Sequence, residues 1–153
     1  MASQKIKPFL WFDDKAEEAA NFYVSLFRDS AITGSTPGPS GVPLVVEFRL
    51  AGVQFLALNG GPHFKFNEAV SLSIDCHSQE EVDELWEKLS AGGSKSQCGW
   101  LKDKYGLSWQ VVPTVLKKLL GSADREKAGR VMNAMRKMTK LEIQALQDAA
   151  DGK

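Results

Sequence analysis

Residues 9–27 read FLWFDDKAEEAANFYVSLF, and residues 72–90, which lie 63 positions further on, read LSIDCHSQEEVDELWEKLS. Both segments begin with a short strand-like run, apolar in the first and alternating in the second, and continue into a helical pattern whose acidic and apolar positions coincide. The coinciding pairs are Glu17 with Glu80, Glu18 with Glu81, Ala19 with Val82, Phe22 with Leu85, Tyr23 with Trp86, and Leu26 with Leu89. This match predicts an internal repeat in which a strand is followed by a helix.

The first segment predicts a buried strand over residues 6–12 and an amphipathic helix over residues 15–28. Asp14 is a suitable N-cap residue, and Glu17 follows it at the third position, as in a capping box. We therefore expect the first helix to be capped by its own sequence.

Two alternating runs follow, at residues 45–50 and 53–58, and Ala51-Gly52 between them predicts a tight hairpin turn. Before this hairpin, residues 34–41 contain three glycines and two prolines, a composition typical of a connecting loop. The loop is either an ordinary connector or, in an enzyme, a lid over the active site.

The second segment predicts a strand over residues 69–76, whose apolar and polar residues alternate. Ser78 and Glu81 then form a capping box for the second helix. Two further strands are predicted near residues 96–102 and 107–112. The whole pattern is strand-helix-strand-strand-strand, written twice.

These patterns predict an α+β fold. We expect residues 1–113 to contain two βαβββ modules, at about 5–60 and 69–113, which form a curved open-barrel sheet with a cleft. Residues 114–153 are expected to be a helical extension of the same domain. In it, Thr139 is predicted to cap the last helix, with Glu142 at the box position. The first predicted helix of the extension has one apolar stripe, made of Ala128, Val131, Met132, Met135 and Met138.

Composition excludes several classes of function. The 153 residues carry 19 basic and 19 acidic side chains, so net charge favours neither a nucleic acid nor an anionic membrane as partner. Two cysteines are too few for a disulfide framework. The N-terminal residues have no apolar signal-peptide region, and no apolar run approaches the length of a membrane span. We expect a soluble, cytoplasmic protein.

Four strings of sequence resemble a known family: FLWFD at residues 9–13, FLALNGGP at 55–62, CGWLKDKYG at 98–106 and SWQVVP at 108–113. In this order they resemble the PhnB-like branch of the vicinal oxygen chelate (glyoxalase, bleomycin resistance and dioxygenase) superfamily. Members of that branch often carry the label 3-demethylubiquinone-9 3-methyltransferase. The resemblance extends from about residue 5 to residue 146. It implies the paired-module fold and specifies activity much less closely.

The methyltransferase label does not agree with the residues. A Rossmann-type methyltransferase needs a Gly-rich turn between a first strand and a helix, and alternating βα units. Neither Gly60-Gly61 nor Gly92-Gly93 occurs in such a context, and the predicted strands come in runs after each helix.

The resemblance also implies a divalent metal held by His, Glu or Gln on the first and last strands of each module. The corresponding positions here fall at about Lys7 or Pro8, at Ser71 and at Gln110. These residues lack the imidazole and carboxylate groups that such a metal prefers. We therefore expect no bound metal and no other cofactor.

The favoured prediction is a small-molecule-binding protein of this superfamily without catalytic metal and without a demonstrable activity. A metal-dependent lyase, isomerase or dioxygenase and an interaction protein that acts through its helical tail are the alternatives. We expect a homodimer, because relatives pair their modules across chains and open sheets leave edges to cover. Glu47 is a polar ligand contact, a general base or a residue of an ordinary solvated strand face. The predicted ligand-binding residues are Trp11, Glu47, Asn59, Phe64, Trp100 and Gln110.

Overall fold

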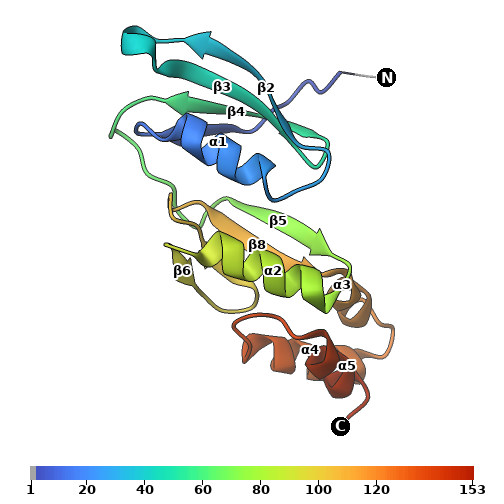
Figure 1. Ribbon diagram of the computed structural model, residues 1–153. Helices are drawn as coiled ribbons and strands as arrows, with labels where there is room; N and C mark the ends of the chain where they lie inside the picture. The colour runs from blue at the N-terminus through green and yellow to red at the C-terminus, as the bar shows by residue number, and fades with distance from the viewer. Residues whose placement is uncertain (1–2) are drawn as a thin grey trace. The chain divides into compact units, whose positions relative to one another are not determined.

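The computed structural model describes residues 3–153. The chain divides into two compact units, and the boundary in the sequence lies between Phe66 and Asn67. Each unit contains one helix packed on one face of a four-stranded sheet (Figure 1). The two units are described separately below.

The first unit has the element order strand, helix and three strands. Its sheet order is β1-β4-β3-β2, with β1 parallel to β4 and the other neighbours antiparallel. The elements are β1 (Phe9–Phe12), α1 (Ala16–Val24), β2 (Ala31–Pro37), a short 3-10 turn η1 (Pro39–Gly41), β3 (Pro43–Leu50) and β4 (Val53–Asn59).

The second unit repeats this topology. Its sheet order is β5-β8-β7-β6, again with one parallel pair, β5 with β8, and antiparallel neighbours elsewhere. The elements are β5 (Ser71–Cys76), α2 (Gln79–Ser90), β6 (Ser94–Lys95), β7 (Trp100–Lys102) and β8 (Ser108–Pro113). The predicted α+β class and the two βαβββ modules are confirmed. The cleft stays a prediction.

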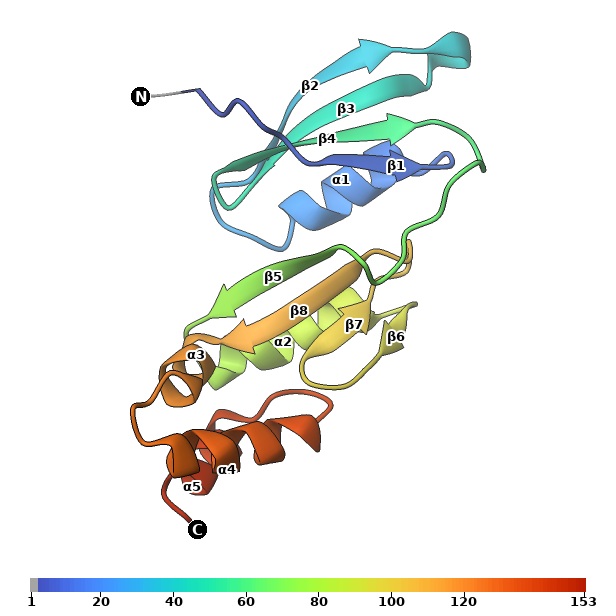
Figure 2. The same ribbon diagram turned by 180° about the vertical axis from the view of Figure 1, so that it is seen from behind.

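Alternation decides which face of each sheet meets its helix. On β3, Val46, Phe48 and Leu50 are buried, whereas Glu47 between them is exposed. Because successive side chains on a strand point to opposite faces, the exposed residues lie on the face away from α1. We call this helix-free side the open face of a sheet. Figure 2 shows the side of the second sheet opposite α2.

Two predictions for the first unit are wrong. The N-cap of α1 is Lys15, and no side chain of its own segment caps it, because Asn59 at the end of β4 supplies the acceptor instead. The first half of the predicted loop at residues 34–41 is the end of strand β2, which pairs with β3 through two irregularities of register, and only the second half is a connection, with the turn η1 in it. Gly and Pro are tolerated there because β2 is an edge strand.

In the second unit the predicted cap of α2 is confirmed, since Ser78 Oγ accepts a hydrogen bond from the Glu81 N–H at 3.2 Å. Of the strand predicted near residues 96–102, only residues 100–102 form a strand, β7, and β6 lies before the predicted range. Cys98, at φ 60°, and Gly99, at φ 84°, interrupt the predicted strand with backbone conformations that a strand does not adopt.

The C-terminal extension consists of three helices, α3 (Thr114–Leu120), α4 (Arg125–Arg136) and α5 (Ile143–Ala150), drawn from orange to red in Figure 1. They share a core of Leu116, Val131, Leu141, Leu146 and Ala150, against which Met135 and Met138 pack. The predicted Thr139 cap is wrong, because α5 begins after Glu142. No described helix has the length and apolar character needed to cross a membrane.

Candidate functional site

The open face of the second sheet carries a grid of polar side chains. The strand register aligns Ser71 of β5, Ser108 of β8, Lys102 of β7 and Ser94 of β6 in one row. The adjacent row contains Ser73, Gln110 and Trp100. This face therefore brings two predicted site residues, Trp100 and Gln110, next to each other on neighbouring strands.

Asp103 shapes the hairpin that places Lys102 opposite Ser108. Asp103 is 2% exposed, and its carboxylate accepts hydrogen bonds from the Trp109 indole N–H at 2.9 Å, the Tyr105 N–H at 2.9 Å and the Leu107 N–H at 3.1 Å. A buried carboxylate is stable only when such donors replace water. These hydrogen bonds within residues 103–109 hold the hairpin between β7 and β8 in the conformation that supports the site.

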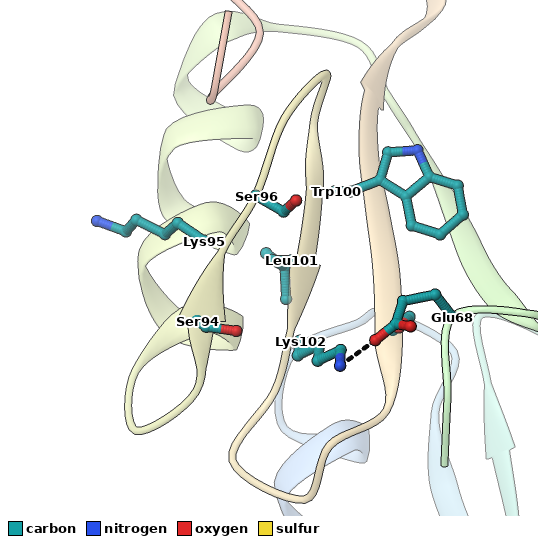
Figure 3. A pocket seen from close by; sticks show the side chains of 8 residues that line it. Glu68, Ser94, Lys95, Ser96, Trp100, Leu101 and Lys102 are labelled. Carbon is teal, nitrogen blue, oxygen red and sulfur yellow. Dashed lines mark ion pairs between the residues drawn. The ribbon is translucent and has the colours of Figure 1, made fainter.

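A pocket of about 320 Å³ opens on this face, at the small end of the range for ligand sites (Figure 3). Its walls combine hydroxyl groups, one ion pair and one indole ring. The lining residues that supply these groups are Glu68, Ser94, Ser96, Trp100, Lys102 and Ser108.

The Ser108 hydroxyl in this pocket has no hydrogen-bond partner among the protein groups that the structure describes. Ser108 is 1% exposed, and among the residues that the structure describes its Oγ is the buried side-chain oxygen without a hydrogen bond. A buried hydroxyl left unpaired costs about 1–3 kcal/mol. Such a group in a pocket wall is a donor and acceptor for a ligand that displaces the atoms covering it.

Glu68 and Lys102 form an ion pair across the pocket, drawn as a dashed line in Figure 3. The hydrogen bond from Lys102 is the main cause that lowers the pKa of the Glu68 carboxyl below its usual range. Both side chains stay partly in solvent, 41% exposed for Lys102 and 59% for Glu68. The other lysine of the pocket, Lys95, points away from Trp100 and pairs with Glu87 at 3.2 Å.

Gln110 and Ser71, the two residues at expected metal-ligand positions in this unit, bind each other. Gln110 Nε2 donates to Ser71 Oγ at 3.0 Å. The pair offers neutral oxygens, whereas catalytic divalent metals prefer carboxylate and imidazole ligands. Within residues 3–153 no cluster of three or more His, Cys, Asp or Glu side chains could hold a metal ion. The residues present do not fit the superfamily's metal.

Trp11 and Phe64 lie together in the first unit. Their rings meet edge to face with centroids 4.9 Å apart, and the Trp11 indole N–H donates to the Gly61 carbonyl at 2.9 Å. A side chain at Gly60 would collide with the Trp11 ring, so the glycine allows the indole to lie on the backbone. Phe64 is 66% exposed and therefore leaves this aromatic pair accessible.

Asn59 and Glu47 occupy different environments in the same unit. Both ends of the Asn59 amide are hydrogen-bonded inside the protein: its Oδ1 accepts from the Ala16 N–H and its Nδ2 donates to the Pro43 carbonyl, both at 2.8 Å. This pairing assigns Asn59 a structural role. Glu47 is exposed on the open face of the first sheet, the side that alternation predicted.

Sequence reasoning missed Ser108, Lys102 and Glu68. Ser108 and Lys102 could have been found from the sequence. Residues two positions apart on a strand share a face, so Ser108 lies on the same face as Gln110, and Lys102 on the same face as Trp100. Glu68 lies in the segment before β5, where no periodic pattern indicates its position. Its proximity to Lys102 follows from the tertiary fold.

Comparison with known proteins agrees with this architecture. The family model described as 3-demethylubiquinone-9 3-methyltransferase matches residues 4–112. The PhnB protein of Bacillus cereus is 36% identical over 72% of this chain and 100% of its own, with a TM-score of 0.69. The chain belongs to this PhnB-like family. The family match ends at residue 112, just before α3 of the C-terminal extension.

More distant structures share the fold with this PhnB-like chain. PA1353 from Pseudomonas aeruginosa is 20% identical over 72% of this chain and 98% of its own, with a TM-score of 0.59. FosX, a fosfomycin resistance protein from Listeria monocytogenes, is 17% identical over 80% of this chain and 100% of its own, with a TM-score of 0.58. These likenesses show that the chain shares its fold with both proteins. No curated protein matches it.

Proposed function

We propose that this protein binds a small organic molecule in the pocket of the second unit and does so without a catalytic metal. The observation that carries the proposal is the buried Ser108 hydroxyl, which has no partner among the described protein groups and lines a pocket shared with Lys102 and Trp100. Native proteins keep few unpaired buried polar groups. A ligand that bonds to Ser108 offsets the cost of leaving its hydroxyl unpaired.

The pocket favours a ligand with a flat apolar part and a polar end. The half-buried Trp100 ring offers a broad apolar surface of the kind that binds aromatic groups. Ser94, Ser96 and Ser108 supply hydroxyl groups that donate and accept hydrogen bonds. A few polar groups beside an aromatic wall is the usual lining of a small-molecule site.

Two other activities have less support. Metal-dependent chemistry of the glyoxalase type needs ligands that Ser71 and Gln110 do not supply. A methyltransferase of the Rossmann type needs a doubly wound parallel sheet. Each sheet here is instead mixed and contains a single parallel pair.

Titration with small flat probes tests the proposal. Benzoate and benzyl alcohol are added to ¹⁵N-labelled protein while the indole N–H signals of the four tryptophans are recorded. We expect at least one probe to shift the Trp100 signal saturably at about 10 mM, the range for ligands of so few atoms. Trp86, buried on α2, is the internal control and its signal should not move. If neither probe shifts Trp100, the proposal is wrong.

A stability measurement tests the unpaired hydroxyl independently of any ligand. Ser108→Ala removes a buried hydroxyl that has no bond, so the free energy of unfolding should stay equal or rise by up to about 1 kcal/mol. The matched variant Ser78→Ala removes a helix cap and should lose about 1 kcal/mol. A clear loss of stability in Ser108→Ala would contradict the absence of a partner.

A further inference from the structure

The Glu68–Lys102 ion pair lies in a pocket wall between hydroxyl-bearing residues. Lys102 lies between Ser94 and Ser108 in the strand register, so its ammonium group has a hydroxyl-bearing residue on each side. A cation flanked by hydroxyl donors is a favourable environment for a carboxylate. In this structure the carboxylate that interacts with Lys102 is that of Glu68.

Glu68 reaches the pocket from outside the sheet. It belongs to the segment between β4 and β5, and the residue itself is exposed. Its attachment to the site is the bond to Lys102, and an exposed ion pair of this kind contributes little to stability. The carboxylate of Glu68 can therefore leave Lys102 without disturbing the strands.

We infer that the pocket selects small carboxylates with an apolar part, and that Glu68 is a resident carboxylate that such a ligand displaces from Lys102. The inference rests on the proposed function and specifies its ligand class. An incoming carboxylate takes over the charge-assisted bond to Lys102 and adds a hydrogen bond from the Ser108 hydroxyl, which Glu68 leaves unpaired. The apolar part of the ligand then lies against Trp100.

The test compares a charged and an uncharged probe of the same shape. Benzoate and benzyl alcohol are titrated into wild type, Glu68→Gln and Lys102→Gln, with the Trp100 indole signal as readout. Glu68→Gln removes the competing charge, so benzoate should bind about threefold more tightly. Lys102→Gln removes the anchoring charge and should weaken benzoate binding about tenfold. Benzyl alcohol affinity should stay the same in both variants.

The matched control is Glu84→Gln. Glu84 also forms an ion pair with a partly exposed lysine, Lys88, but on α2 outside the pocket. This variant should bind benzoate with wild-type affinity. Thermal unfolding of each variant verifies that the fold is retained.

The outcomes separate this inference from the proposed function. If benzyl alcohol shifts Trp100 as strongly as benzoate does, and Glu68→Gln changes neither affinity, the pocket binds small molecules without selecting carboxylates and the inference is wrong. If neither probe binds to any variant, the proposed function itself fails. A gain in benzoate affinity in Glu84→Gln equal to that in Glu68→Gln would also overturn the inference, because the effect would then come from net charge.

Discussion

Asn59 illustrates how one side chain can join three parts of a module. Its amide accepts from the first N–H of α1 and donates to the Pro43 carbonyl at the start of β3, while its own backbone ends β4. An unsatisfied helix N–H and an unsatisfied carbonyl would remain without it. The residue therefore secures the point where helix and sheet meet.

Replacing this amide should destabilise the first unit. We expect Asn59→Ala to lower the free energy of unfolding by about 1–3 kcal/mol, because two partly buried backbone groups lose their partner. Asn21→Ala is the matched control, since Asn21 makes one exposed bond within its own helix and should change stability by less than about 0.5 kcal/mol. Urea unfolding followed by circular dichroism measures both. Equal effects would contradict the structural role of Asn59.

The buried Cys76 thiol makes the stability of the fold depend on pH above the usual range of a thiol pKa. Cys76 is fully buried at the end of β5, and burial, reinforced by the charges of Glu81 and Asp75, raises the pKa of its thiol from 9.0 to about 12. The folded pKa lies above the unfolded one, so the thiol's contribution to stability is complete below pH 9.0. It is lost as pH rises towards about 12.

We expect the free energy of unfolding of wild type to fall more steeply above pH 9.0 than that of Cys76→Ala. Ile74→Ala controls for lost packing on the same strand and should keep the wild-type slope. Denaturant unfolding at a series of pH values provides the comparison. Parallel curves for wild type and Cys76→Ala would show that the thiol titrates alike in folded and unfolded chains.

At the scale of elements, α2 holds the C-terminal extension through the side chains of Gln79 and Asp83. Gln79 Oε1 accepts from the Ile143 N–H at 2.7 Å, and Gln79 Nε2 donates to the Leu141 carbonyl at 3.2 Å. Beside it, Lys140 and Asp83 form an ion pair at 2.8 Å. The start of α5 is thereby fastened to the first turn of α2.

Loss of this attachment should loosen the extension. Gln79→Ala should cost about 1–3 kcal/mol and speed amide exchange in α5, because the Ile143 N–H and the Leu141 carbonyl lose their partners. Gln144→Ala, which removes an exposed bond to Asp148 within α5, should leave exchange unchanged. Hydrogen exchange followed by NMR reports both variants. Unchanged exchange in Gln79→Ala would show that the apolar core alone holds α5.

For the whole molecule we expect a homodimer. Each open sheet ends in two edge strands, β1 and β2 in the first unit and β5 and β6 in the second, and exposed edges favour association. Sedimentation equilibrium at micromolar concentration should give twice the 16.8 kDa mass of the chain. A stable monomer under these conditions would contradict the expectation.

The sequence by itself determined the architecture of the modules, because periodicity is written in neighbouring residues. Strand alternation and helical stripes need information from only a few positions, and so does the Ser78 capping box. The polar face that carries Gln110 and the core face that carries Trp109 followed from the same alternation. Repetition of the pattern then predicted two modules of one topology.

The tertiary structure alone decided which distant groups meet. Asn59 caps a helix 43 residues earlier in the chain and Gln79 caps one 64 residues later, so local capping boxes at Asp14 and Thr139 were not used. The contact of Glu68 with Lys102 and the burial of Ser108 without a protein partner are likewise results of the tertiary fold. Hydrogen bonding and burial depend on distance in space, which a local pattern does not contain.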